Sequence, residues 1–297
     1  MIRHALLAIA ATLLPASAPV EILGEAVLFA PGIASTHFSE IRLTISPDGN
    51  TALWFSRNRP GGPGGYDIWL SRRTNTGWAA AKPVPFNSPG RDFDPAFSPD
   101  GRFVYFSSDR PGGLGKDDIY RVAVTRAGFG SAEHLGPTVN SAANEWAPML
   151  SPDRTHLLFS SDRPGGAGRQ DLYAARREGA QYLPAAALPG AVNSVADEFD
   201  ATYLADSRAI VFARAPDLSA DRIDLFAANA PDGRYQTGTR LPPSVNSGDV
   251  YGPMLDWSGP GSLTFSARRP GAAGMDLYLI RYRQESLRRT RAPRADP

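Results

Sequence analysis

Five acidic residues recur along this chain at intervals of roughly 50 residues, and most of them stand directly before an aromatic side chain. The segments are Glu40-Ile41, Asp92-Phe93, Glu145-Trp146, Glu198-Phe199 and Asp249-Val250-Tyr251. Carboxylates gathered in one place repel one another, so such a set could hold a cation or a ligand rich in lysine and arginine. Alternatively, each acid forms an ion pair with an arginine of a nearby loop; the candidates are Arg59, Arg110, Arg163 and Arg269. We favour the ion pairs, because a repeated pattern serves the architecture, whereas chemistry needs residues that differ between repeats.

Sequence motifs of common hydrolases are missing. The chain contains no Gly-x-Ser-x-Gly elbow, no His-Glu-x-x-His and no cysteine, so α/β-hydrolase, zinc-protease and thiol chemistry have no support. The histidines His37, His134 and His156 fall on different repeats without the spacing of metal ligands. We therefore expect no catalytic residue, no metal site and no cofactor.

The acidic segments belong to a longer unit that occurs five times. Its clearest copies are residues 96–120 and 149–173, with another at 44–69 and weaker ones at 203–226 and 254–278. Two residue types recur at fixed places; they are Phe55, Phe106, Phe159, Phe212 and Phe265, and Asp67, Asp118, Asp171, Asp224 and Asp276. A period of about 50 residues with strand-like segments indicates a propeller, solenoid or array.

Each copy divides into about four strands. A run ending in Ser-Pro-Asp-Gly comes first, then an alternating apolar run such as 103–106, then a strand opening at an anchor aspartate, then a weak strand such as 133–135. Four antiparallel strands form the blade of a β-propeller. We predict an all-β propeller of five four-stranded blades, with six as the alternative, although the sequence contains no sixth repeat. The repeats are expected at about 38–91, 92–143, 144–196, 197–248, and 249–283 together with 22–30.

The last blade is predicted to close with a strand from the start of the chain. The fifth copy supplies three strands, at 251–257, 262–267 and 275–283, and no fourth strand follows. Residues 22–30 are strand-like and precede the first repeat, and Ala34-Ser35 takes the place of the Asn-Ser loop between blades. Closure of this kind removes free sheet edges, which otherwise favour aggregation.

The alternating strands also decide which loops share a face. The Ser-Pro-Asp-Gly turns lie on one face, and the Arg-Pro-Gly-Gly loops and the Asn-Ser loops lie on the other, which we call the loop-rich face. Binding residues concentrate in loops on a rigid scaffold. Because first strands line the central channel, the expected partner-binding residues are Glu40, Asp92, Phe93, Glu145, Trp146, Glu198, Phe199, Asp249 and Tyr251, with Arg59, Arg110, Arg163 and Arg269.

The anchor aspartates open the third strands after glycine-rich loops. We expect their carboxylates to accept hydrogen bonds from loop N–H groups. Calcium binding is the alternative, since aspartate and carbonyl oxygens suit Ca²⁺, but the spacing matches no EF-hand loop.

The first 18 residues indicate where in the cell the protein is found, and the last 14 form a separate basic segment. Residues 1–18 combine a positive start, an apolar run from Ala5 to Leu14 and the pattern Ala16-Ser17-Ala18, as in a secretory signal peptide cleaved near Ala18. The apolar run is too short to span a bilayer, so no stable membrane insertion is expected. Residues 284–297 are rich in arginine and are expected to form a basic flexible tail. The net charge of the 297 residues is +1, which indicates no nucleic-acid partner.

The Ser-Pro-Asp-Gly turns, followed by Phe-Ser-Ser-Asp-Arg-Pro-Gly-Gly and Asp-Ile-Tyr, resemble the Pro-Asp subclass of WD40-like repeats found in the TolB-type β-propeller family. The resemblance covers roughly residues 22–283 and is strongest in the first three copies. In the last two, Ala205-Asp206 and Gly259-Pro260 replace Pro-Asp. It implies a periplasmic or secreted propeller that binds partner proteins.

These observations predict a monomeric, non-catalytic module that binds a protein or peptide of the cell envelope. The alternative is a glycoside hydrolase or carbohydrate-binding protein. Some five-bladed propellers hydrolyse glycosides with channel-mouth carboxylates, for which Asp92, Glu145 and Glu198 are candidates. Trp146, Phe199 and Tyr251 would then stack on sugar rings.

Overall fold

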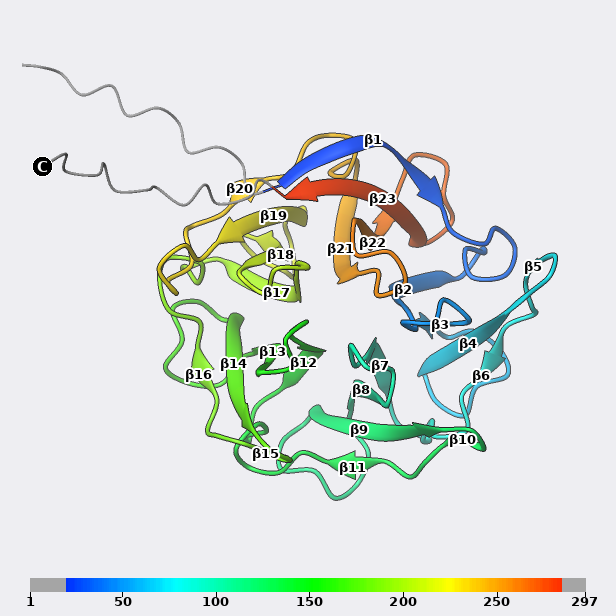
Figure 1. Ribbon diagram of the computed structural model, residues 1–297, viewed down its shortest axis with the longest axis horizontal. Coiled ribbons are helices and arrows are strands. Elements are labelled where there is room, and N and C mark those ends of the chain that lie inside the picture. Colours follow the sequence, from blue (N-terminus) through cyan, green and yellow to red (C-terminus); the bar gives the residue numbers. More distant parts are fainter. Residues whose placement is uncertain (1–19, 285–297) are drawn as a thin grey trace, which may run out of the picture.

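The computed structural model describes residues 20–284, which form five separate antiparallel sheets arranged as a ring around a central axis (Figure 1). The predicted all-β, five-bladed propeller is confirmed. Within this part of the chain, no helix is long and apolar enough to cross a membrane. The predicted signal peptide at 1–18 and the basic tail lie outside the described residues, apart from Gln284, which ends the last strand.

Each blade is built outward from the channel in the order predicted by the repeat. The innermost strands are β2 (Ser39–Ile45), β7 (Asp92–Phe97), β12 (Glu145–Leu150), β17 (Asp197–Tyr203) and β21 (Asp249–Leu255). The second strands are β3 (Thr51–Arg57), β8 (Phe103–Ser108), β13 (His156–Ser161), β18 (Ala209–Ala215) and β22 (Ser262–Arg268). The third strands are β4 (Tyr66–Thr74), β9 (Asp118–Thr125), β14 (Asp171–Glu178), β19 (Asp224–Asn229) and β23 (Asp276–Gln284).

The outer strands are short except in the last blade. In the first three blades the outer strand is two pieces of two residues each: β5 (Gly77–Trp78) and β6 (Lys82–Pro83), β10 (Gly128–Phe129) and β11 (Glu133–His134), and β15 (Gln181–Tyr182) and β16 (Ala186–Ala187). The fourth blade has β20 (Thr239–Arg240), and the fifth has β1 (Val20–Leu28). Edge strands of only two residues offer little template for pairing with another chain.

The ring closes through β1, as predicted. β1 runs antiparallel to β23, from the pair Val20↔Gln284 to the pair Leu28↔Tyr278, and the two strands lie side by side in Figure 1. It begins and ends two residues earlier than the expected span of 22–30, and its register shifts between Leu23 and Val27, where Gly24 has a φ of +73°. Ser35 then bonds the backbone of Leu277 through its hydroxyl, where the other loops use an asparagine side chain.

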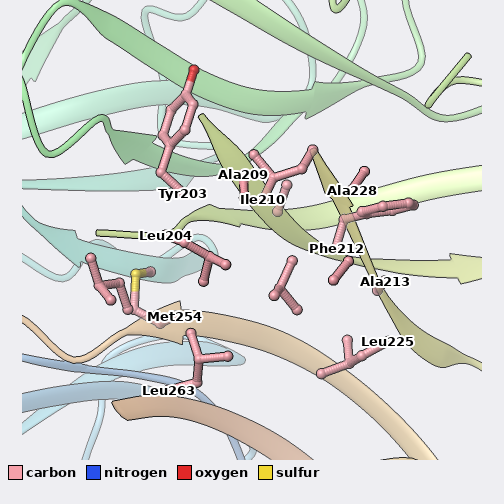
Figure 2. Close-up of a cluster of buried hydrophobic side chains, with 14 of the residues drawn as sticks. Tyr203, Leu204, Ala209, Ile210, Phe212, Ala213, Leu225, Ala228, Met254 and Leu263 are labelled. Atoms are coloured by element: carbon pink, nitrogen blue, oxygen red, sulfur yellow. The ribbon is translucent and has the colours of Figure 1, made fainter. Parts of the chain in front are cut away.

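The core lies within and between the blades. The anchor phenylalanines are buried in every blade. Figure 2 shows part of the core between two blades, where Phe212 and Ile210 of β18 belong to the same cluster as Met254 and Leu263 of the next blade. The asparagine of each Asn-Ser loop bonds the backbone of the third strand in the blade that the loop leaves. Asn140, for example, accepts from the N–H of Ile119 at 2.7 Å and donates to its carbonyl at 3.0 Å.

Every innermost strand carries a bulge near its start. The residue at the bulge has a left-handed backbone in all five blades; the set is Arg42, Asp94, Ala147, Asp200 and Gly252. Bulges re-aim side chains and recur next to binding sites. This position varies between blades while the residues around it repeat.

Deleting residues 20–28 should lower the melting temperature by more than about 10 °C, because the outer edge of β23 loses its partner and the ring loses its closure. Circular dichroism melts would measure the change. Val27→Ser is the matched control, since Val27 lies on the same strand with its side chain 66% exposed. A truncated protein that melts like the intact one would contradict the closure.

Candidate functional site

Four of the predicted acids are fully buried beside the loops that join the blades; they are Glu40, Asp92, Glu145 and Glu198. The carboxylate of Glu145 accepts hydrogen bonds from the N–H of Ser141 at 3.0 Å, the hydroxyl of Ser141 at 2.5 Å and the hydroxyl of Ser161 at 3.1 Å. It also pairs with Arg163 at 2.9 Å. The other three are held alike by Thr36, Ser88 and Ser194. We call each set a carboxylate latch.

An arginine completes each latch. The guanidinium of Arg163 donates to the carbonyl of Val139 at 2.7 Å and lies 4.8 Å from the ring centroid of Tyr173. Its planar group can thus bond a carboxylate and a carbonyl while stacking on an aromatic face, which a lysine could not do. Two further pairs expected from the sequence are present: Arg59 with Glu40 at 3.4 Å and Arg110 with Asp92 at 2.5 Å.

The latch of the fourth blade uses an arginine that the sequence analysis missed. Pro216 stands where the other blades carry the arginine. Arg214 replaces it from β18, with its Nε 2.7 Å from Glu198. An arginine two residues after the anchor Phe212, instead of four, was the available signal.

The five acids do not form an open ring of carboxylates around the channel mouth; three of them make the favoured pairs with the loop arginines. Four acids point into latches, where hydrogen-bond donors compensate the cost of burial. In the fifth blade the loop after Asn246 is one residue shorter, so Val250 is buried where the acid would be and Asp249 is exposed. Arg269 consequently has no acidic partner within residues 20–284 and donates to the carbonyl of Ser244 at 2.9 Å.

The fifth blade provides a control for the energy of a latch. Arg163→Met leaves the carboxylate of Glu145 buried without its cation, which should cost about 3–5 kcal/mol of unfolding free energy. Arg269→Met removes a guanidinium that also stacks on a ring, 4.3 Å from Tyr278, but strands no carboxylate. It should cost less than half as much. Urea unfolding measures both, and equal losses would show that the carboxylate adds nothing.

The predicted aromatics meet at the loop-rich mouth of the channel. They line a cavity of about 420 Å³, together with Tyr66 of β4; the predicted members are Phe93, Trp146, Phe199 and Tyr251. Trp146 and Tyr251 are half-buried, whereas Phe93 and Phe199 are buried. The indole N–H of Trp146 donates to Asp117 at 2.9 Å, which fixes the ring. The acids that precede Phe93, Trp146 and Phe199 are buried in the latches, whereas Asp249, which precedes Tyr251, lines the cavity.

Two carboxylates that the sequence analysis missed lie in this cavity. Asp94 and Asp200 occupy the bulge positions of the second and fourth blades and are 4% and 7% exposed. Asp94 accepts from the N–H of Ala147 and Asp200 from the N–H of Gly252, both at 3.1 Å. The sequence signal was the second acid, two residues after the latch acid, which appears in these two repeats and not in the others.

A buried arginine lies beside these two carboxylates. Arg42, at the bulge of the first blade, is fully buried and donates to the carbonyl of Ala147 at 3.0 Å. Its Nε and Nη1 have no hydrogen-bond partner among the described residues. The exposed edge of the cavity, its rim, carries the charged side chains of Arg57, Arg268 and Asp249.

Burial and the neighbouring Asp200 raise the pKa of Asp94 to about 8, against the lowering effects of Arg42 and Arg57. Burial raises the pKa of Asp200 as well. A carboxyl in the unfolded chain ionises near pH 4. The folded protein therefore holds a proton that the unfolded chain releases, and the stability this proton gives is present at low pH and lost as the pH rises from about 4 to about 8.

The melting temperature of Asp94→Asn minus that of the unsubstituted protein should therefore increase as the pH rises from about 5 to about 9, because the amide cannot ionise. Asp48→Asn is the control. Hydrogen bonds from Ser46 and Asn50 lower the pKa of Asp48, so its titration is complete below this range. If the difference between Asp94→Asn and the unsubstituted protein were constant with pH, the raised pKa would be refuted.

The anchor aspartates bond their glycine-rich loops in the first three blades. Asp118 accepts from the N–H groups of Leu114 at 2.8 Å and Gly115 at 3.2 Å, and Asp67 and Asp171 do the same. The loop passes so close to Asp118 that a Cβ at Gly113 would collide with its carboxylate. In the fourth blade, Asp224 pairs with Arg240 at 2.8 Å instead.

No protein-family model and no curated protein matches the chain. Solved structures match it in fold at low sequence identity. TolB from Acinetobacter baumannii aligns with a TM-score of 0.52 and 15% identity over 88% of this chain, which spans 64% of that protein. An α-L-arabinofuranosidase from Lactobacillus brevis gives a TM-score of 0.56 and 11% identity over 86% of this chain and 92% of the enzyme. A thermostable family-43 glycoside hydrolase gives 0.55 and 7% over 90% of this chain and 100% of that chain. At these identities the likenesses show the propeller fold alone, and a fold by itself does not indicate a function.

Proposed function

We propose that this protein is a non-catalytic binding module of the cell envelope, periplasmic or secreted. As a monomer, it takes a peptide segment of a partner protein at the centre of its loop-rich face. The observation that carries the proposal is the aromatic-lined cavity at the channel mouth. The sequence of residues 1–18 supports the compartment.

The cavity has the properties of an anchor site. Its volume of about 420 Å³ suits one or two side chains of a peptide rather than a folded domain. Trp146 is held by Asp117, so little side-chain entropy is lost when a ligand packs against the ring. Fixed aromatic side chains at the centre of a face are typical hot spots of protein interfaces.

The latches favour binding over catalysis at the acids named from the sequence. Each latch carboxylate is saturated by loop donors and an arginine, so Asp92, Glu145 and Glu198 have no exposed oxygen to offer a glycosidic bond. They stiffen the loops around the cavity. A stiff rim lowers the ordering cost of binding.

A second candidate, glycoside hydrolysis, is favoured by Asp94 and Asp200. Burial raises the pKa of both carboxyl groups, and the charge of Asp200 raises the pKa of Asp94 further. Both residues stand at the bulge position, where the residue type differs between blades. A protonated carboxyl beside a second carboxylate is the arrangement that glycosidases use as acid and base or nucleophile. Aromatic walls would stack on sugar rings.

Trp146→Ala should weaken capture of the partner from an envelope extract by about 1–3 kcal/mol, because the anchor ring is lost. Tagged protein on beads, with quantitative mass spectrometry of bound proteins, measures the loss. Leu114→Ala is the matched control, since Leu114 is a 50% exposed apolar side chain on the same face and does not line the cavity. Melting curves must show that Trp146→Ala remains folded; otherwise Trp146→Phe, which keeps a ring, replaces it.

Asp200→Asn separates the two candidates. Aryl arabinofuranosides and xylosides incubated with the unsubstituted protein should release no phenol above background. Steady turnover that Asp200→Asn abolishes, while the variant melts normally, would overturn the binding module in favour of the hydrolase.

A further inference from the structure

We propose that the floor of the channel-mouth cavity binds the positively charged head of a lysine or arginine side chain carried by the partner segment. The inference rests on the proposed function, since it says which chemical group of the partner enters the cavity.

The two carboxyl groups at the floor have unused capacity for hydrogen bonds. Asp94 and Asp200 are 4% and 7% exposed and line the cavity beside the buried guanidinium of Arg42. Each carboxylate accepts one backbone hydrogen bond through Oδ2, and its Oδ1 accepts none within residues 20–284. A buried carboxylate favours an opposite charge over an apolar neighbour. An ammonium or guanidinium head supplies both the charge and the N–H donors.

The walls suit an organic cation. Trp146, Phe199 and Tyr251 line the cavity with no arginine stacked on them in the described chain, whereas Phe93 and Tyr66 already face Arg91 at 5.8 Å. Faces of aromatic rings attract ammonium and guanidinium groups. The latches place guanidinium groups on rings in the same manner, as Arg214 does over Phe212 at 5.0 Å. Aromatic carbon gives a metal ion no ligand, so the walls favour a side chain over a bare ion.

The charges at the rim indicate which residues flank the lysine or arginine in the partner segment. Arg57 and Arg268 are exposed at the cavity edge and form no ion pair within residues 20–284. They would repel an isolated cation, but they match a segment in which acidic residues flank the basic one. The expected motif is one lysine or arginine between acidic residues.

Cation binding should also displace a proton. The groups that act on Asp94 are Asp200, Arg42 and Arg57, and the other titratable groups around the cavity are Asp249, Arg268, Arg91, Tyr66 and Tyr251. The Asp94 carboxyl is protonated at neutral pH, and a bound cation favours its ionised form. Binding should therefore tighten as the pH rises from about 6 to about 9.

The probes are three acetylated, amidated tripeptides: Glu-Lys-Glu, Glu-Arg-Glu and Glu-norleucine-Glu. Norleucine matches lysine in length without the charge. Titrations would follow the indole N–H resonance of Trp146 by NMR, assigned from its loss in Trp146→Phe. We expect at least one of the two basic peptides to bind about tenfold tighter than the norleucine peptide, and their ranking shows whether ammonium or guanidinium is preferred.

Two protein variants make the result specific. Asp200→Asn should remove the preference for the basic peptides, and Asp94→Asn should remove the pH dependence, while Asp48→Asn on the opposite face changes neither. Equal binding of all three peptides, or a preference that survives both cavity substitutions, overturns the inference. If Trp146→Ala loses the partner and Asp200→Asn captures it normally, the proposed function stands without the cation. If neither substitution affects capture, the proposed function fails as well.

Discussion

The buried carboxylate at the start of an innermost strand is the constraint on which the loop-rich face depends. An acid such as Glu145 is fully buried, so its charge must be met by donors from the loop before it and from the arginine after the second strand. That need ties together three segments of the blade: the connection from the previous blade, the first strand and the Arg-Pro-Gly-Gly loop. The loops that surround the cavity are therefore fixed by an interaction that does not itself line the cavity.

The candidate site lies at a position of the innermost strands where the five blades carry residues of different charge. Identical side chains at equivalent positions serve the packing of every blade, as the anchor phenylalanines do. At the bulge the five blades instead place an arginine, two aspartates, an alanine and a glycine. Five nearly equal blades thus carry an asymmetric set of charges at the bulge, where Asp94 and Asp200 line the cavity and the charge of Arg42 acts on both.

The features that recur in several repeats could be predicted from the sequence, whereas the direction in which each side chain points could not. Blade number, strand order, the closing strand and three ion pairs were readable, because each rests on a pattern present several times. The exposure of the acids was not readable, since an acid and the aromatic after it point to opposite sides of a strand and the bulge sits two residues further on. Asp249 looked equivalent to Glu198, yet one residue fewer in the preceding loop gives its place to Val250. Arg214 escaped notice because the cation had moved from the loop onto the strand.

The pairing of β1 with β23 has a consequence for how the molecule forms. Residues as far apart as Glu21 and Arg283, separated by 262 positions, contact each other in the last blade. Four blades can assemble from neighbouring segments as they appear, but the fifth requires both extremes of the described chain at once. Such distant contacts form late and slowly, because the loop they close is long. Until then the outer edge of the third strand of the last blade is free, and a free strand edge can pair with another chain.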